Sequence, residues 1–186
     1  MRDKLAKLLL LFSLLLTIMI TSLLLSISST DQQVTTTLAQ TSEKMIIYDN
    51  PAFGIRIEYP SDWGRLDLSF LEHSADIDFY PLNDTSLAKN LKVQVKNLPF
   101  HNMTLEEYTN SQINLLEENL LESSAATLAG IPGYKIVFTN IEGLKTMQVW
   151  TIKDDKAYII TYVAQEEDYE KELQIAQKMI DSFEIK

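Results

Sequence analysis

Residues 134–163 read YKIVFTNIEGLKTMQVWTIKDDKAYIITYV, and this stretch decides the fold. Apolar side chains crowd three segments of it, Tyr134–Thr139, Leu144–Ile152 and Ala157–Val163, which we predict to be strands. The polar residues 153–156 (KDDK) separate the last two segments and are typical of a short hairpin turn. Because strands joined by such short turns pair antiparallel, the stretch predicts an antiparallel sheet.

Three more strands are predicted upstream of this stretch. Phe53–Tyr59 alternates apolar and polar residues, and the turn residues of 60–64 end it. Ala75–Tyr80 is the second strand, and Leu91–Lys96 is the third. Leu91, Val93 and Val95 fall on one face of the third strand, which predicts that this face is buried.

Two helices are predicted among these strands. Thr104 and Glu107 have the spacing of a capping box and begin a helix over residues 105–122. Residues 130–133 (GIPG) are a predicted turn, and the acidic run Glu166–Asp168 begins the last helix. The order of strands, helix, strands and helix predicts an α+β fold, an antiparallel sheet flanked by helices in an α/β/α sandwich.

The N-terminal residues predict where the domain lies. Residues 1–7 are basic, and residues 8–27 run for twenty positions without a charge. A helix of that length rises about 30 Å, so it predicts a transmembrane or signal helix with all later residues outside the cytoplasm. Its length favours a retained anchor. The small-x-small sequences at 26–28 and 37–39 keep cleavage and secretion as the alternative.

The remaining residues divide into a tether and one domain. Residues 28–44 are rich in Ser, Thr and Gln and predict a flexible tether, and residues 45–186 have the length of a single domain. Without residues 1–30 the chain holds 13 basic and 25 acidic residues, a net charge of −12. This charge argues against nucleic acid and anionic lipid as partners and favours basic protein surfaces or cations. The sequence has no cysteine, which excludes disulfides and thiolate chemistry.

Several of these segments together resemble the PsbP family, whose namesake is the extrinsic lumenal subunit of photosystem II. They are YDNPAFGIRIEYPSDW at 48–63, LAGIPGYKIVFT at 128–139, QVWTIKDDKAYIITYVA at 148–164, and the residues 182–185. The resemblance covers about residues 48–185. The sequence is similar to PsbP-like proteins of non-photosynthetic prokaryotes, archaea included. It implies a sheet sandwiched by helices and a non-catalytic accessory role in an extracytoplasmic complex. It does not imply a photosystem role, because the N-terminus lacks a twin-arginine transit region.

One local cluster contains the residue types that bind metals. Asp76 and Asp78 would point to the same side of a strand, and His73 lies in the preceding turn. Such ligands suit a hard or borderline cation such as Ca²⁺, Mn²⁺ or Zn²⁺. The alternative is a solvated strand face of an acidic protein, and we favour this alternative because three residues make a weak motif.

Other candidate residues have simpler structural interpretations. His101 is expected in a surface loop, and Trp63 and Trp150 are expected in the core rather than as exposed anchors for a partner. The aromatic residues Tyr134, Phe138, Tyr158 and Tyr162 are also expected in the core. Asn83 and Asn102 begin glycosylation sequons. Acidic residues are expected on solvated helix faces, with a docking surface for a basic partner as the alternative; they are Glu117, Glu118, Glu122 and Glu166–Asp168.

The functional hypothesis follows from these patterns. The sequence has no G-x-S-x-G, phosphate loop or H-E-x-x-H motif, so we expect that the protein is not an enzyme. We predict a membrane-anchored or secreted extracytoplasmic binding domain that acts in a protein complex and has no cofactor. A small-ligand or divalent-metal carrier is the alternative, and a secreted hydrolase is less favoured.

Overall fold

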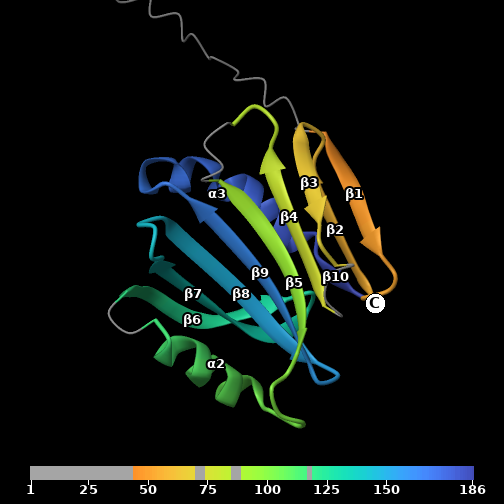
Figure 1. Cartoon of the computed structure of the whole chain (residues 1–186), viewed down its shortest axis with the longest axis vertical. Coiled ribbons are helices and arrows are strands. Elements are labelled where there is room, and N and C mark those ends of the chain that lie inside the picture. The colour runs from red at the N-terminus through yellow and green to blue at the C-terminus, as the bar shows by residue number, and fades with distance from the viewer. Residues whose placement is uncertain (1–43, 70–73, 85–88, 117–118) are drawn as a thin grey trace, which may run out of the picture. The chain divides into compact units, whose positions relative to one another are not determined.

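A seven-stranded antiparallel sheet forms the centre of the domain in the computed structural model, which describes residues 44–69, 74–84, 89–116 and 119–186 (Figure 1). The strand order is β3-β4-β5-β9-β8-β7-β6. These strands are β3 (Trp63–Asp67), β4 (Ala75–Pro81), β5 (Asn90–Asn97), β6 (Leu120–Leu128), β7 (Ile131–Thr139), β8 (Lys145–Lys153) and β9 (Lys156–Ala164).

A second, three-stranded sheet brings the two ends of the domain together. Its order is β1-β2-β10, formed by β1 (Met45–Asn50), β2 (Ile55–Pro60) and β10 (Glu184–Ile185). The backbone N–H of Glu58 on β2 donates to Ser182 Oγ at 2.9 Å, and the N–H of Lys186 donates to the carbonyl of Gly54 at 2.8 Å. The last residues of the chain therefore complete a sheet that the first residues of the domain begin.

Two hairpins of the large sheet use two-residue turns with positive φ angles. Asp154 and Asp155 join β8 to β9 with φ angles of 52° and 58°, as the KDDK sequence predicts. Ala129 and Gly130 join β6 to β7 with φ angles of 52° and 75°. Gly133, three residues further on, has a different role. A Cβ there would lie 2.2 Å from the Trp150 carbonyl oxygen, so β7 and β8 approach each other only with glycine at this position.

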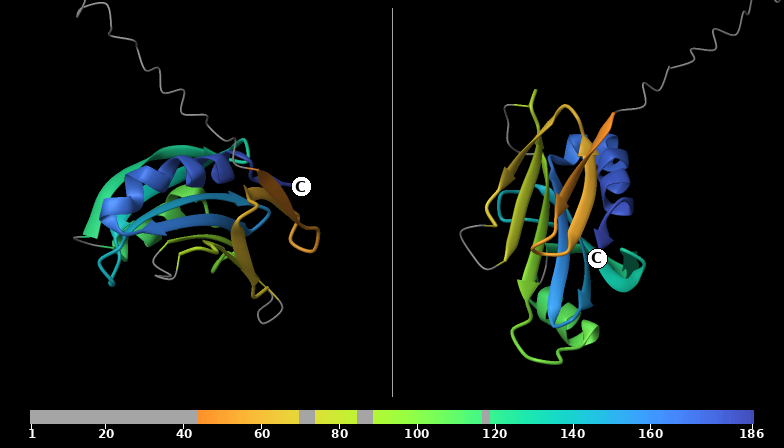
Figure 2. Two further views of the ribbon diagram at one scale, coloured as in Figure 1. Left: turned by 90° about the horizontal axis from the view of Figure 1, so that it is seen from above. Right: turned by 90° about the vertical axis from the view of Figure 1, so that its right-hand side faces the viewer.

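One face of the large sheet, which we call the packed face, carries the main core. Helix α3 (Glu166–Asp181) and the three-stranded sheet pack against it (Figure 2). Alternate residues of β4 and β5 point into this core, as the predicted period of two requires. The fully buried side chains there include Ile77, Phe79, Leu91, Val93, Ile160 and Tyr162.

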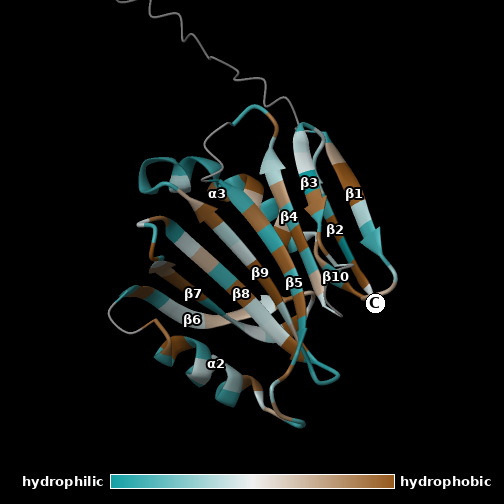
Figure 3. Ribbon diagram, in the orientation of Figure 1, coloured by the Kyte–Doolittle hydropathy of each residue, from teal (hydrophilic) through white to brown (hydrophobic). Residues whose placement is uncertain are grey.

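The opposite face, which we call the half-open face, is covered only in part by the described residues. Helix α2 (Leu105–Asn114) covers it over β7, β8 and β9, where a smaller cluster contains Tyr108, Ile136 and Trp150. In front of β4 and β5 no described helix lies over the strands, and polar side chains alternate with the apolar ones of the core (Figures 1 and 3). The two helices thus lie on opposite faces, in agreement with the predicted α+β sandwich.

Four strands and one helix end differ from the sequence-based predictions. The strands β1, β3, β6 and β10 were not predicted, and the helix over 105–122 was wrong at its C-terminal end, because α2 ends at Asn114. Leu120 is instead paired with Phe138 at the start of β6. Ladder hydrogen bonds to β7 and the packing of Leu120 in the smaller cluster therefore outweigh the helical spacing of the leucines. The predicted turn at 130–133 was also too long, since β7 begins at Ile131.

The predicted segments before the domain lie outside the described residues. These are the basic residues 1–7, the membrane or signal helix at 8–27, and all but the last residue of the tether at 28–44. Within the described ranges no helix has both the length and the apolar character that crossing a membrane requires.

Candidate functional site

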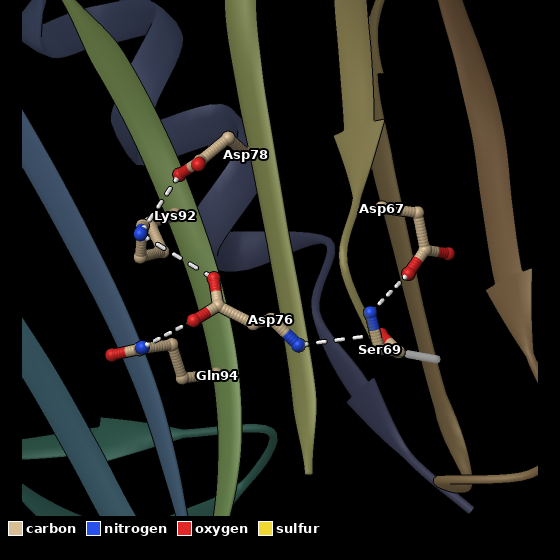
Figure 4. A network of polar contacts seen from close by, with 6 residues as sticks. All are labelled: Asp67, Ser69, Asp76, Asp78, Lys92 and Gln94. Atoms are coloured by element: carbon tan, nitrogen blue, oxygen red, sulfur yellow. Dashed lines mark hydrogen bonds and ion pairs between the residues drawn. The ribbon is translucent and has the colours of Figure 1, made fainter. Parts of the chain in front are cut away.

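A polar network on the half-open face joins β4 to β5 (Figure 4). The antiparallel register places Asp76 opposite Gln94 and Asp78 opposite Lys92. Because the neighbouring residues on both strands point into the core, all four polar side chains must lie on the other face. The sequence predicted this orientation for Asp76 and Asp78, and the register adds the two partners.

The Lys92 ammonium lies between the two carboxylates. Its Nζ is 3.4 Å from Asp76 Oδ1 and 3.4 Å from Asp78 Oδ1, and Gln94 Nε2 donates to Asp76 Oδ2 at 3.0 Å. Both Oδ1 atoms are shielded from solvent and accept no well-formed hydrogen bond within the described residues. A distance of 3.4 Å is long for a charge-assisted hydrogen bond, so the attraction to Lys92 is mainly Coulombic.

Burial makes one carboxylate of this network easier to protonate. It raises the pKa of Asp78 above its usual range, the charge of Lys92 opposes this shift, and the charge of Asp76 adds to it. The two carboxylates and one ammonium leave a net negative charge on the network at neutral pH. The site can therefore accept hydrogen bonds or a further positive charge from a partner.

The predicted metal site is placed only in part. His73 lies outside the described residues, and Asp76 and Asp78 share a face as expected. No group of three His, Cys, Asp or Glu side chains with metal-binding geometry occurs among the described residues. The Lys92 ammonium lies beside both Oδ1 atoms, so a cation would have to displace it or bind further out. Metal binding by His73, Asp76 and Asp78 stays a prediction.

A second carboxylate, at the edge of the packed face, is held by directed hydrogen bonds. Asp67 Oδ2 accepts from the Tyr48 hydroxyl at 2.6 Å, and Asp67 Oδ1 accepts from the Ser69 N–H at 3.0 Å. Burial alone would raise the pKa of Asp67, but the hydrogen bonds from Ser69 and Tyr48 outweigh it and lower the pKa. Burial and the bond to Asp67 in turn raise the pKa of Tyr48 to about 12. Ser69 Oγ also accepts from the Asp76 N–H at 3.3 Å, which connects this site to β4.

The remaining candidate residues have the structural roles that the sequence favoured. Trp63 and Trp150 are buried, as are Phe138, Tyr158 and Tyr162, while Tyr134 is partly buried. Thr104 and Glu107 form the predicted capping box of α2. Among the acidic residues, Glu166–Asp168 form the first turn of α3, and Glu117 and Glu118 lie outside the described residues. Glu122 is exposed, but the prediction of a helix face was wrong for it, because it lies on strand β6.

Three residues from exposed loops were also candidates. His101 Nδ1 lies 2.7 Å from Asp155 Oδ2, so it pairs with the turn between β8 and β9. Asn83 and Asn102 are both exposed, as sequon residues must be for modification. Asn102 has a φ angle of 60°, and its N–H donates to Asp155 Oδ1 at 3.1 Å. These contacts hold the loop before α2 against the hairpin.

An apolar groove of about 420 Å³ lies between α2 and the β6–β7 hairpin. Leu105 and Ile113 line it from the helix, and Ala125, Pro132 and Tyr134 line it from the strands. Glu106 is the one carboxylate among its lining residues. The groove could hold an apolar side chain or a small apolar ligand.

Sequence reasoning missed Lys92, Gln94 and Asp67 as members of polar networks. Lys92 and Gln94 alternate with Leu91, Val93 and Val95, so their orientation could have been inferred. Their pairing with Asp78 and Asp76 depends on the register between β4 and β5, and the sequence does not determine that register. Asp67 lies on a strand that the sequence analysis did not predict.

The fold and the motifs define a known class of domain. A family model described as PsbP-like protein matches residues 8–185, and the chain belongs to this PsbP-like family. Its fold is similar to that of cyanobacterial PsbP (CyanoP) from Synechocystis sp. PCC 6803. That match has a TM-score of 0.60 and 16% identity, and it covers 77% of this chain and 94% of that one. The resemblance to the PsbP family is thereby confirmed.

Two further structures are more distant. A protein from Bacteroides thetaiotaomicron VPI-5482 has a TM-score of 0.49 and 16% identity over 75% of this chain and 48% of that chain. LpqN of Mycobacterium tuberculosis, described as involved in cell envelope biogenesis, has a TM-score of 0.47 and 12% identity over 77% of this chain and 92% of its own. No curated protein matches the sequence.

Proposed function

We propose that this protein is a non-catalytic, extracytoplasmic PsbP-like binding domain, tethered to the membrane by residues 8–27, that acts in a protein complex. Family membership supports the extracytoplasmic location, and the basic residues before the apolar segment support the orientation. In this proposal the domain recruits or positions another protein and has no catalytic role of its own.

The observation that carries the proposal is the uncovered part of the half-open face. Lys92, Asp76 and Asp78 are fixed there by ion pairs, and their side chains remain 33%, 27% and 21% exposed. Leu66 on β3 points to the same side as its cross-strand partner Asp78 and is 49% exposed. Fixed charges beside an exposed aliphatic side chain are typical of a surface that recognises a polar protein partner. The net charge of −12 favours a partner with a basic surface.

A photo-crosslinking experiment in the native membrane tests the proposal. A crosslinking amino acid at Leu66 should capture a protein partner that survives solubilisation in mild detergent. The matched control is Ile47, an aliphatic residue on β1 with a similar exposure of 52%, which should capture none. Recovery of only the uncrosslinked monomer from the Leu66 position, across several mild detergents, would contradict the proposal.

The carrier function remains the second candidate because of the groove beside α2. Its volume of about 420 Å³ and its mostly apolar lining suit a small apolar ligand.

Calorimetric titration with Ca²⁺, Mn²⁺ and Zn²⁺ at physiological salt tests the metal alternative. Saturable binding that is lost in both His73→Ala and Asp76→Ala would favour a metal carrier over the binding domain.

A further inference from the structure

The loop before α2 carries a sequence motif that the proposed function does not use. Asn102, Met103 and Thr104 form an N-x-T sequon, in which an asparagine amide is followed two residues later by a hydroxyl. All three residues of this sequon are described. The other sequon of the chain begins at Asn83, and its threonine lies outside the described residues. The sequon at Asn102 is therefore the one whose surroundings the structure defines in full.

The side chain of Asn102 is available to solvent on a fixed turn. Asn102 is exposed, and its side-chain amide makes no hydrogen bond to any described residue. Its backbone has a φ angle of 60°, and its N–H donates to Asp155 Oδ1 at 3.1 Å. His101 beside it also pairs with Asp155 and stays 77% exposed. The turn is thus held by the backbone and by a neighbouring residue, which leaves the Asn102 amide free to carry a bulky, solvated group.

Building on the extracytoplasmic location in the proposed function, we propose that Asn102 carries an N-linked glycan. In the reaction, Nδ2 of Asn102 forms a bond to the anomeric carbon of an oligosaccharide that is carried on a polyprenyl phosphate. The bond between that carbon and the phosphate oxygen breaks, and the carrier leaves as the free phosphate with the displaced amide proton. An oligosaccharide transferase of the host supplies the catalysis, and this chain supplies the acceptor.

The folded loop occupies the hydroxyl group of the sequon. Thr104 is the N-cap of α2, and its Oγ1 donates to Glu107 Oε2 at 2.9 Å and accepts from the Glu107 N–H at 3.2 Å. Freeing this hydroxyl means losing the cap, and an N-cap residue changes a folding equilibrium by about two- to thirty-fold. The sequon is therefore more accessible before α2 forms, and we expect the glycan to be added before the domain folds.

The order of the chain keeps the sequon open during synthesis. A ten-residue helix such as α2 is marginally stable by itself in water. The residues that hold it come later, since Asp155 lies 53 residues after Asn102 and Trp150 lies 41 residues after Thr109. At about 5–20 residues per second, 53 residues are synthesised in about 3–10 s. During this interval the transferase can reach an extended sequon.

A glycan at this position would also cover an exposed aromatic side chain. Phe100 is 71% exposed, and together with Asn102 and Met103 it lines a surface hollow of about 370 Å³. Because glycans are bulky and hydrophilic, one attached to Asn102 would shield the Phe100 ring from contact with other chains.

Mass spectrometry of the full chain from its own membranes tests the proposal. Trypsin separates the two sequons, because Asn83 falls in peptide 66–89 and Asn102 falls in peptide 97–135. Most of peptide 97–135 should carry a glycan mass, which Asn102→Gln should remove and Asn83→Gln should leave unchanged. A peptide 97–135 that is mainly unmodified overturns the proposal.

A matched pair of variants at Thr104 separates the sequon from the helix cap. Thr104→Ser keeps a hydroxyl for both roles and should keep the glycan. Thr104→Asn keeps a good N-cap residue but has no hydroxyl, so it should lose the glycan while α2 still forms. Both variants should unfold cooperatively. Equal modification of the two variants would show that the glycan does not depend on this sequon.

Two further measurements separate timing and location. In a pulse-chase experiment the modified fraction should be complete when synthesis ends, and a fraction that rises during the chase would overturn addition before folding. In this cysteine-free chain, Ser124→Cys is exposed and should react with a membrane-impermeant maleimide in intact cells. A labelled but unmodified chain would overturn the glycan alone. An unlabelled chain would overturn the extracytoplasmic location of the proposed function as well.

Discussion

The two faces of the large sheet bury the alternate side chains of the same strands to different extents. On the packed face, residues such as Phe79 and Val93 are fully buried beneath the small sheet and α3. On the half-open face, the next residues along the same strands are Asp78 and Lys92, which remain partly exposed. One strand thus supplies stability through one set of residues and, in the proposed function, a recognition surface through the other. Mutations on β4 should therefore separate the two properties.

The largest expected effect is on the packed face. Phe79 is fully buried and its ring lies 5.9 Å from that of Tyr48 and 4.8 Å from that of Tyr59. Phe79→Ala should lower the free energy of unfolding by about 3–5 kcal/mol, because it removes a large buried side chain and leaves a cavity. Urea unfolding measures this loss. A decrease below about 1 kcal/mol would mean that this face does not carry the main core.

The covered part of the half-open face should show an intermediate effect. The indole N–H of Trp150 donates to Thr109 Oγ1 of α2 at 3.1 Å in a buried position. Thr109→Val leaves this donor unpaired and should cost about 1–3 kcal/mol. Thr109→Ser is the control that keeps the acceptor. Hydrogen exchange should quicken in α2 while β4 and β5 stay protected, and equal acceleration throughout would show that α2 is not a separate unit.

Asp67 lies at the edge of the packed face and Asp78 lies on the half-open face. Their contributions to the stability of the fold should depend on pH in opposite directions. The folded-state pKa of Asp67 is lowered, so its contribution to stability is present above its usual pKa and is lost as the pH falls through the folded value. The folded-state pKa of Asp78 is raised, so its ionisation costs stability at neutral pH, and this cost disappears as the pH falls towards 4.

The matched variants Asp67→Asn and Asp78→Asn test these directions. Asp67→Asn should be about 1 kcal/mol less stable than wild type at pH 7, and the gap should close on acidification. Asp78→Asn should be as stable as wild type or slightly more stable at pH 7, and its relative stability should fall on acidification. Unfolding free energies between pH 3 and 7 give both slopes. Slopes of the same sign would show that burial and hydrogen bonding do not separate these two carboxylates.

The smallest effect is expected at the exposed end of the half-open face. Leu66 is 49% exposed, so Leu66→Ala should change the free energy of unfolding by less than about 0.5 kcal/mol. The same variant should weaken partner capture, because it removes an apolar contact from the proposed binding surface. A large loss of stability would instead assign Leu66 to the core and remove it from that surface.

The parts of the fold that follow from local patterns were predictable from the sequence. The β8–β9 hairpin was predictable because the Asp154–Asp155 turn lies between two strongly apolar strands. The start of α3 was predictable because the acidic run Glu166–Asp168 forms its first turn. Strand β6 was not, since the leucines before it continue the spacing of α2 and only pairing with β7 makes the segment extended. The candidate site was likewise predictable only where it follows from a local pattern. The orientation of Asp76 and Asp78 follows from the period of two, whereas the position of Lys92 depends on register.

The closing of the small sheet by the last residues has a consequence for how the chain is made. Strand β2 is among the first elements of the domain to be synthesised, but its partner β10 and the Ser182 hydroxyl that binds Glu58 are among the last. Contacts this distant along the chain form late, because the loop between them must first be closed. The N-terminal strands therefore remain without one of their partners until β10 has been synthesised.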